Sequence, residues 1–318
     1  MDPNRSVTGQ KPITLKRGQA SVFDLIDGNM AAGLAFAGAK TVYYVDGNAG
    51  SDTGNTGTGS WDNAFKTLAV AFAASHADIA TGKFGWAARN VILCRGDYFV
   101  ETIAAFPQKT DVIGVGSIDA FKGAGLTGNH APINTHLGTR FYNFMFRPAA
   151  SSNLITMTSA GSGTEFHNCA FHGKHSTFTA VSAIDVTAQP NVVISGCKFI
   201  GEFSGDVIDV GAGDASGMRI EGNDIIGGAN DGIVISGVAT VGGLVDRGVI
   251  QNNFIEVAGI CLDTRAVSVF NVYNNRMISA AAVGSSSYVI DLTFACDNIL
   301  TGNDIGVRIP SITDITTA

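Results

Sequence analysis

A six-residue pattern of apolar and polar positions recurs along the second half of the chain. In each copy an apolar residue begins and ends the segment, the third residue is Asn or Gly, and the fourth is Asn or Cys. The six copies begin 22 to 30 residues apart, at 166–171, 194–199, 220–225, 250–255, 272–277 and 300–305, and a looser copy lies at 141–146. A repeat of this length indicates a solenoid, in which each coil stacks on the preceding one.

Each column of the pattern has a physical role. The third position is restricted to residues that tolerate a positive φ, as a sharp bend between two strands requires. Residues at the fourth position would stack about 4.8 Å apart and form an inward ladder of hydrogen-bonded amides. The predicted ladder consists of Cys169, Cys197, Asn223, Asn253, Asn275 and Asn303. The two cysteines suit these positions because they are small and weakly polar.

A second strand is predicted between successive copies of the pattern. Its segments are 155–157, 184–186, 208–210, 233–235, 260–262 and 290–292. Alternation along a strand places the outer two residues of each segment inside and the central residue outside. Two aligned strand columns predict an all-β protein, a right-handed parallel β-helix with three-strand coils, about seven to eight in number. Leucine-rich repeats and propellers fit less well because their consensus residues are absent.

The front of the chain has a different organisation. Residues 41–46 read as a strand, and a loop rich in Gly, Asn, Thr and Ser follows at 47–59. Phe65, Leu68, Ala69 and Phe72 are spaced as one face of a helix, which we expect near 62–76 with Asp62 or Asn63 as its N-cap. A further strand and bend are expected at 90–98.

The order of these front segments resembles a known family. Tyr44-Val45-Asp46, Gly50-Ser51-Asp52, Ala64-Phe65-Lys66-Thr67-Leu68 and then Val91-Ile92-Leu93 with Gly96 and Tyr98 are similar to the opening of many pectate-lyase-like right-handed β-helix proteins, many of them from bacteriophages. The resemblance covers about residues 41–305. It implies that the helix caps the open end of the solenoid, and that the protein belongs with virion or tailspike-type β-helix proteins, which are commonly trimers.

The two ends of the chain lie outside this resemblance. Residues 1–40 read as an extended N-terminal arm that anchors the protein to a neighbouring subunit or to other virion proteins. Residues 306–318 contain several isoleucines and are expected to form a C-terminal cap or oligomerisation tail. The start has no apolar segment typical of a signal peptide, so we expect assembly in the host cytoplasm and localisation in the virion.

Composition excludes several classes of partner. The formal net charge is −7 and no basic run is present, which argues against nucleic acid. No apolar stretch reaches about 18 residues, so membrane insertion is not expected. The odd number of cysteines favours free buried thiols at Cys94, Cys169, Cys197, Cys261 and Cys296 over a disulfide framework.

Three aspartates are the candidates for catalysis. Asp185 and Asp209 would lie on the outer face of neighbouring coils, where a close carboxylate pair suits retaining glycoside hydrolysis or calcium binding. A solvated outer face is the simpler interpretation. Asp231, in Asn230-Asp231-Gly232, faintly resembles a polygalacturonase segment, but the remaining catalytic residues of that family are missing. A turn that enters a strand explains it better.

The sequence gives only weak indications of metal ligands and of residues that stack on sugars. His167, Cys169, His172 and His175 have ligand-like spacing, yet a strand would send them to different faces. Asp46, Asn48 and Asp52 have the early spacing of a calcium loop, which lacks its final Glu because Gly57 stands there. No metal or other cofactor is therefore expected. The aromatic candidates are Tyr142, Tyr273 and Tyr288, while Trp61 and Trp86 lie in the predicted cap region.

The resemblance implies a protein displayed on a bacteriophage particle, as a capsid decoration protein or a tail-associated adhesin, and the absence of a recognisable catalytic set favours a non-catalytic role. The alternative is a tailspike depolymerase that hydrolyses or eliminates a host polysaccharide, with its catalytic residues on the Asp185/Asp209 face. Sparse aromatic side chains among the coils argue against the enzyme.

Overall fold

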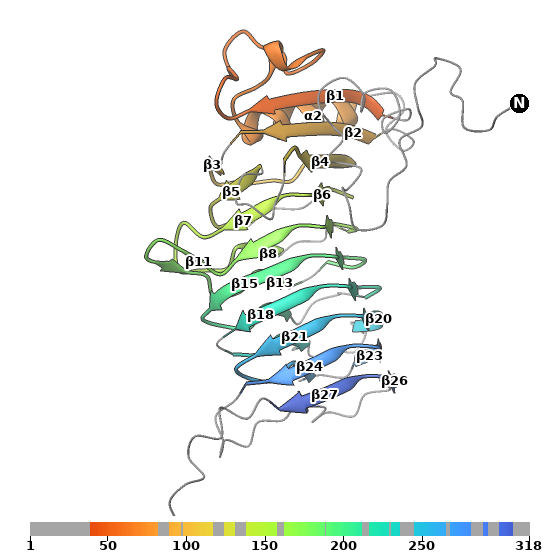
Figure 1. The fold of residues 1–318 in the computed structure, drawn as a ribbon. Helices are drawn as coiled ribbons and strands as arrows, with labels where there is room; N and C mark the ends of the chain where they lie inside the picture. The colour runs from red at the N-terminus through yellow and green to blue at the C-terminus, as the bar shows by residue number, and fades with distance from the viewer. Residues whose placement is uncertain are drawn as a thin grey trace, which may run out of the picture.

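The structure is a computed structural model that describes most of the chain. The described residues are 39–81, 89–96, 98–116, 124–130, 138–157, 162–187, 189–211, 216–228, 230–235, 245–264, 268–280, 289–291 and 299–307. Their strands stack into an elongated rod, with α2 at its N-terminal end beside β1 and β2 (Figure 1). The chain is a right-handed parallel β-helix, as the repeat predicts.

Three parallel sheets form the walls of the rod, and we call them sheets A, B and C. Sheet A contains β1 (Ala39–Asp46), β2 (Arg89–Arg95), β4 (Thr110–Gly114), β6 (Arg140–Tyr142), β9 (Glu165–His167), β14 (Val193–Ser195), β17 (Arg219–Glu221), β20 (Val245–Gln251), β23 (Ser268–Tyr273) and β26 (Ile299–Thr301). Sheet B contains β3 (Tyr98–Val100), β5 (Gly125–Thr127), β7 (Met145–Arg147), β10 (Ala170–His172), β15 (Lys198–Phe203), β18 (Asp224–Gly228), β21 (Phe254–Val257), β24 (Arg276–Ser279) and β27 (Asp304–Val307). Sheet C contains β8 (Ile155–Met157), β13 (Ile184–Val186), β16 (Ile208–Val210), β19 (Ile233–Ile235), β22 (Leu262–Thr264) and β25 (Ile290–Asp291). Within the described residues, six coils therefore contribute a strand to all three sheets, and partial coils lie at both ends.

The bend between sheets A and B is the same in successive coils. It holds a residue with φ between 50° and 66° at Asn143, Asn168, Gly196, Gly222, Asn252, Asn274 and Gly302. These are the third positions of the sequence pattern. Asn and Gly occur there because other residues would be strained at positive φ.

The fourth position of the pattern points into the rod and forms a continuous ladder. Oδ1 of Asn253 accepts the backbone N–H of Asn223 at 3.0 Å and its side-chain amide at 2.9 Å. The same pair of bonds joins Asn253 to Asn275, at 2.9 Å for both, and Asn275 to Asn303, at 3.0 Å for both. Each amide also donates to a carbonyl of the preceding coil, so every ladder amide in this run is satisfied.

The two cysteines continue this ladder toward the N-terminus. The backbone N–H of Cys197 donates to Oδ1 of Asn223 at 2.8 Å. The thiols of Cys169 and Cys197 donate to the carbonyls of Phe141 and Phe166, in the same way as the asparagine amides of later coils. Both side chains are buried and unbridged. Cys94 and Cys261 are buried free thiols as well, and Cys296 lies outside the described residues.

Aromatic rings fill the N-terminal half of the lumen. Phe146, Phe171 and Phe199 stack from coil to coil with ring centroids 4.9 and 4.8 Å apart and interplanar angles of 10° and 7°. Phe141 and Phe166 stack beside them at 5.5 Å. The rings match the coil spacing because in-register parallel strands repeat at about 4.8 Å.

The capping helix differs from its prediction. The helix α2 is Leu68–Thr81 and begins six residues later than expected, while Trp61–Asn63 forms the short 3-10 helix η2. Neither Asp62 nor Asn63 caps α2. Glu101 instead accepts the backbone N–H groups of Leu68 and Ala69, at 2.9 Å each, from a segment more than 30 residues away. Local sequence cannot show such a cap because its acceptor is brought in by the solenoid.

Two further details depart from the predicted pattern. The second-strand segment expected at 260–262 is displaced by two residues, since Leu262–Thr264 pairs with β19 and β25. Cys261 therefore precedes the strand and is buried, and Asp263 takes the central position. Val234 is the central residue of β19 and is also buried, so the outer face of sheet C is not exposed to solvent along its whole length.

The terminal segments overlap only slightly with the described structure. The strand β1 begins at Ala39, and β27 extends to Val307. The rest of the predicted arm (1–38) and of the predicted tail (308–318) lies outside the described residues. None of the helices in the described part of the chain has the length and apolarity needed to span a membrane.

Candidate functional site

Asp185 and Asp209 lie side by side on the outer face of sheet C. They are register partners in β13 and β16, while their neighbours Ile184, Val186, Ile208 and Val210 face the lumen. The Asp185 carboxylate accepts hydrogen bonds from Nδ2 of Asn153 at 2.8 Å and from Oγ1 of Thr187 at 3.1 Å. Burial raises the pKa of Asp185, and the adjacent charge of Asp209 raises it further, against the opposing effect of the two hydrogen bonds.

A polar cavity of about 390 Å³ lies next to this carboxylate. It is lined by Asn129, His130, Ser151, Ser152, Asn153, Thr156 and Val181, and we call it the sheet C pocket. Asn153 links it directly to Asp185, and Thr156 is the register partner of Asp185 in β8. The pocket therefore borders the Asp185–Asp209 pair on the outer face of sheet C.

The wall of the pocket is held in place by Asn129. Its Oδ1 accepts the backbone N–H of Ala150 at 2.8 Å, and its Nδ2 donates to the carbonyls of Ser152 and Asn153 at 3.0 and 2.9 Å. One side chain thus fixes the loop between β7 and β8. Within the described part of the chain, the hydroxyls of Ser151, Ser152 and Thr156 make no hydrogen bond, so they remain open to a ligand.

His130 is the one buried titratable group among the pocket's lining residues. It is 1% exposed, and its Nδ1 accepts the backbone N–H of Ile103 at 3.1 Å. Burial lowers the pKa of His130 to about 4, so the ring is neutral near pH 7 and carries its proton on Nε2. Among the described residues, this buried Nε2 has no hydrogen-bond partner.

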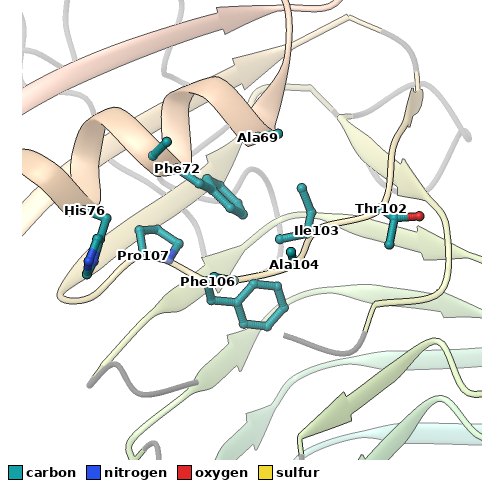
Figure 2. A pocket seen from close by; sticks show the side chains of 10 residues that line it. Ala69, Phe72, His76, Thr102, Ile103, Ala104, Phe106 and Pro107 are labelled. Carbon is teal, nitrogen blue, oxygen red and sulfur yellow. The ribbon is translucent and has the colours of Figure 1, made fainter. Parts of the chain in front are cut away.

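A second cavity, of about 340 Å³, lies between α2 and the segment after β3 (Figure 2). Its floor consists of the buried side chains of Phe72, Ile103 and Phe106. Alanines 69, 73, 104 and 105 form much of its rim. The lining is largely apolar and offers few groups that could orient a polar ligand or act on one.

The predicted catalytic Asp231 has a structural role. Its Oδ1 accepts the backbone N–H of Ile260 in the next coil at 2.7 Å, and its own carbonyl accepts the N–H of Val207. The side chain is 9% exposed. It therefore holds the turn before β22 and is not brought to Asp185.

The predicted calcium ligands are engaged elsewhere. Asp46 accepts the backbone N–H groups of Asn48 and Ala49 and forms an ion pair with Arg95 at 2.7 Å. Asp52 accepts the N–H groups of Lys66 and Thr67 ahead of α2. The two carboxylates thus stabilise separate turns. Among the described residues, no group of three or more His, Cys, Asp or Glu side chains is arranged to hold a metal ion.

The zinc and aromatic candidates are also dispersed. His167 lies on the outer face of sheet A, where it bonds to Glu165 at 2.7 Å and stacks on Tyr142 at 4.9 Å. Cys169 faces the lumen, whereas His172 and His175 lie in β10 and the β11 (Lys174–His175)/β12 (Phe178–Thr179) hairpin. Tyr273 lies further along sheet A, opposite Gln251 and Thr301, so the two described tyrosines do not converge on the sheet C pocket. Tyr288 lies outside the described residues.

The sequence pattern identifies only part of this site. Asp185 and Asp209 are found because they occupy the centre of a repeating strand. Asn129 and His130 belong to a coil without the recurrent pattern, and only the pairing of His130 with Ile155 brings them to the pocket. One sequence feature could have indicated this loop as part of a site: three consecutive polar residues, Ser151, Ser152 and Asn153, stand immediately before a predicted strand.

Comparisons with known proteins add little about activity. No protein-family model matches the sequence, and no curated protein matches it. Among solved structures the chain is similar to pectate lyase Pel9A, with 12% sequence identity, a TM-score of 0.46 and coverage of 88% of this chain and 83% of that chain. A likeness at this level does not transfer a catalytic mechanism.

Proposed function

We propose that this chain is a non-catalytic protein displayed on the surface of a bacteriophage particle, as a capsid decoration protein or a tail-associated adhesin. The sheet C pocket is its ligand-binding site. Residues 1–40 anchor the rod to other virion proteins, and the protein assembles as a homotrimer. The order of motifs in residues 41–305, which is similar to that of phage β-helix proteins, supports the viral assignment.

The fixed carboxylate of Asp185 beside a polar pocket is the observation that carries the binding role. Asn153 and Thr187 donate to its two different oxygens, Oδ2 and Oδ1. Each carboxylate oxygen retains further lone-pair capacity, so Asp185 is a positioned acceptor for ligand hydroxyl groups. The rigid β-helix holds this acceptor and the open hydroxyls in one geometry, which favours binding because little ordering is required.

The stoichiometry of the chain in purified particles tests the virion role. We expect it to co-purify with particles in a fixed ratio to the major capsid protein. A ratio near that of the capsid subunits indicates capsid decoration, and a much smaller ratio indicates the tail. A chain that separates from particles during purification, with no fixed ratio, would contradict the proposal.

A depolymerase is the second candidate, favoured by the raised pKa of Asp185 and its pairing with Asp209. Asp185 would act as general acid, and the Asp209 side chain would assist from the next coil. Cleavage of host polysaccharide by the wild-type chain, abolished by Asp185→Asn or Asp209→Asn, would establish this activity. Asp224→Asn, an exposed aspartate on sheet B, is the matched control. Absence of cleavage by the wild-type chain would contradict the depolymerase hypothesis.

A further inference from the structure

We infer that the second cavity, between α2 and the segment after β3, is covered by residues 30–37 of the same chain, which lie outside the described residues. We call this cavity the cap groove, and Figure 2 shows it with Phe72 and Phe106 at its centre and with His76 and Thr102 toward opposite ends. The bound segment would fasten the N-terminal arm to the end of the rod. The inference goes beyond the functions proposed above and does not depend on the sheet C pocket.

The outer face of α2 lacks the charged residues of an ordinary surface helix. Its buried side chains, such as Phe72 and Ile79, face the rod, and its ionisable residues, His76 and Asp78, are partly buried in its C-terminal half. The exposed residues of the helix are Ala69, Ala73, Ala77, Ala80 and Thr81. A surface helix normally carries charged side chains opposite its apolar face, and a helix that is apolar on all sides is normally buried. The composition of α2 therefore indicates that another segment covers its outer face.

The cap groove extends this apolar surface onto the segment that follows β3. Its floor consists of Phe72, Ile103 and Phe106, which are 3%, 2% and 0% exposed. Exposed alanines 69, 73, 104 and 105 form its rim. Covering this lining removes apolar surface from water, which is the main favourable term in docking. The groove therefore favours an apolar occupant over a small polar ligand, which would find few hydrogen-bonding partners in it.

The chain contains an apolar segment directly before β1. Residues 30–37 read Met-Ala-Ala-Gly-Leu-Ala-Phe-Ala, and no charged residue occurs between Asp27 and Lys40. The other apolar runs of the arm are interrupted by charged residues. Leu34 and Phe36 supply large side chains for the groove, while the alanines and the glycine beside them let the backbone approach the alanine rim closely. The segment thus matches the groove in polarity and in the size of its side chains.

The start of β1 lies within reach of the groove. Oγ1 of Thr41 donates to a carboxylate oxygen of Asp78 at 2.8 Å, so the strand begins beside the C-terminal half of α2. Phe72 lies six residues before Asp78, about 9 Å along the helix. Leu34 lies five residues before Ala39, a span of up to about 17 Å. A chain that reverses its direction before β1 can therefore return along α2 and place Leu34 over the cap groove.

A short tether favours the chain's own segment over that of a second copy. Because the segment immediately precedes β1, its effective concentration at the groove is in the millimolar range. A segment from a separate copy would compete at its concentration in solution, which is far lower. Residues 1–29 take no part in this contact, so the arm can bind other partners while its base is fixed to the rod.

Cysteine cross-linking in the full-length chain tests the contact. Leu34→Cys and Ala73→Cys are introduced together in a Cys296→Ser background, because the other four native cysteines are buried free thiols. Mild oxidation should link residues 34 and 73 within one chain, at a rate that does not change when the protein is diluted. Val22→Cys with Ala73→Cys is the matched control. Its tether is long enough to reach the groove but lies outside the segment, so it should link at least about tenfold more slowly.

Hydrogen exchange in the full-length chain, with its native cysteines, measures how well the groove is covered. Leu34→Asp together with Phe36→Asp should speed exchange of the backbone amides of residues 102–106 by about fivefold or more, because a charged segment leaves the apolar groove. Val22→Asp together with Ile26→Asp is the matched control in the arm and should leave this exchange unchanged.

The contrary results are distinct. Links that form between two chains, and that weaken on dilution, would overturn the assignment of the segment to the same chain. Equal rates of linking from positions 22 and 34, or exchange unaffected by Leu34→Asp with Phe36→Asp, would show that residues 30–37 do not occupy the groove. Each of these results leaves the proposed role of the sheet C pocket untouched, because that pocket lies in a different part of the rod.

Discussion

The side-chain oxygen of Asn253 accepts two hydrogen bonds from Asn223, one from its backbone N–H at 3.0 Å and one from its side-chain amide at 2.9 Å. Asn253 in turn donates its own backbone N–H and side-chain amide to Oδ1 of Asn275. The ladder is therefore directional and couples each coil to the next through buried amides. A single substitution within it affects two neighbouring coils.

Asn253→Leu should destabilise the protein by roughly 2 to 4 kcal/mol, because the two donors of Asn223 and the carbonyl of Ile220 would lose their buried partner. Urea denaturation of the variant and wild type measures the difference. Asn271→Leu, at an exposed position of β23, is the control and should change stability by less than about 0.5 kcal/mol. Equal effects of the two substitutions would show that the ladder does not contribute to stability.

Cys169 and Cys197 should react slowly with thiol reagents in the folded protein. Both are buried, and burial raises the pKa of Cys169 well above its ordinary value, so little reactive thiolate is present. Time-resolved labelling followed by mass spectrometry of the peptides measures this, with urea-unfolded protein as the control. Labelling of the two residues at the rate seen in the unfolded chain would place them outside the lumen.

Glu101→Ala should weaken the N-terminal cap of α2. It removes the carboxylate that accepts the backbone N–H groups of Leu68 and Ala69. Helix-cap losses cost about 1 kcal/mol, and the negative charge near the helix N-terminus contributes in addition. Thermal unfolding measures the loss, and Glu202→Ala, which affects only an exposed ion pair with Lys174, is the matched control. A melting temperature unaffected by Glu101→Ala would mean that the cap is dispensable.

His130 should make stability depend on pH. Burial lowers the pKa of His130 from 6.5 to about 4 in the folded state, so the unfolded chain binds more protons between these values. The contribution of His130 to the free energy of unfolding is fully present above about pH 6.5. It is lost progressively as the pH falls toward 4, by about 3 kcal/mol in total.

Comparison of wild type with His130→Gln separates the contribution of His130 to the pH dependence of stability from the contributions of other groups. The pKa of His172 is lowered as well, so part of the slope will remain in the variant. The free energy of unfolding, measured from pH 7 to pH 4, should fall less steeply for His130→Gln. Parallel curves for the two proteins would show that His130 is not buried in its neutral form.

Much of the solenoid follows from its repeat. Positions that must adopt a positive φ accept few residue types, and positions that stack into a ladder must be small and polar. These restrictions recur once per coil, so they are visible without coordinates at Asn252 and Asn253 and at their equivalents. The same argument places Asp185 and Asp209 on one outer column, because a strand alternates its faces.

The sequence predicts irregular coils less accurately than regular ones. Within the repeat, β22 lies at Leu262–Thr264 and not at the expected 260–262, because three-residue strands with similar neighbours do not define their register. Outside the repeat, the N-cap of α2 differs from the predicted one. Asp62 and Asn63 are good local N-caps, yet α2 begins after Thr67, whose hydroxyl accepts the N–H of Val70 at 3.4 Å, and Glu101 supplies two further acceptors from another coil.

By itself, the sequence determined the parallel β-helix, its bends, its inward ladder and the outward pairing of Asp185 with Asp209, because each depends on the alternation of a strand or on a local restriction that recurs from coil to coil. Only the tertiary structure decided that Asn129, His130 and Ser152 share a pocket beside that pair, that Asp231 holds a turn, and that Asp46 and Asp52 stabilise separate loops. Those relationships join residues from different coils, and the stacking of one coil on another is what brings them together.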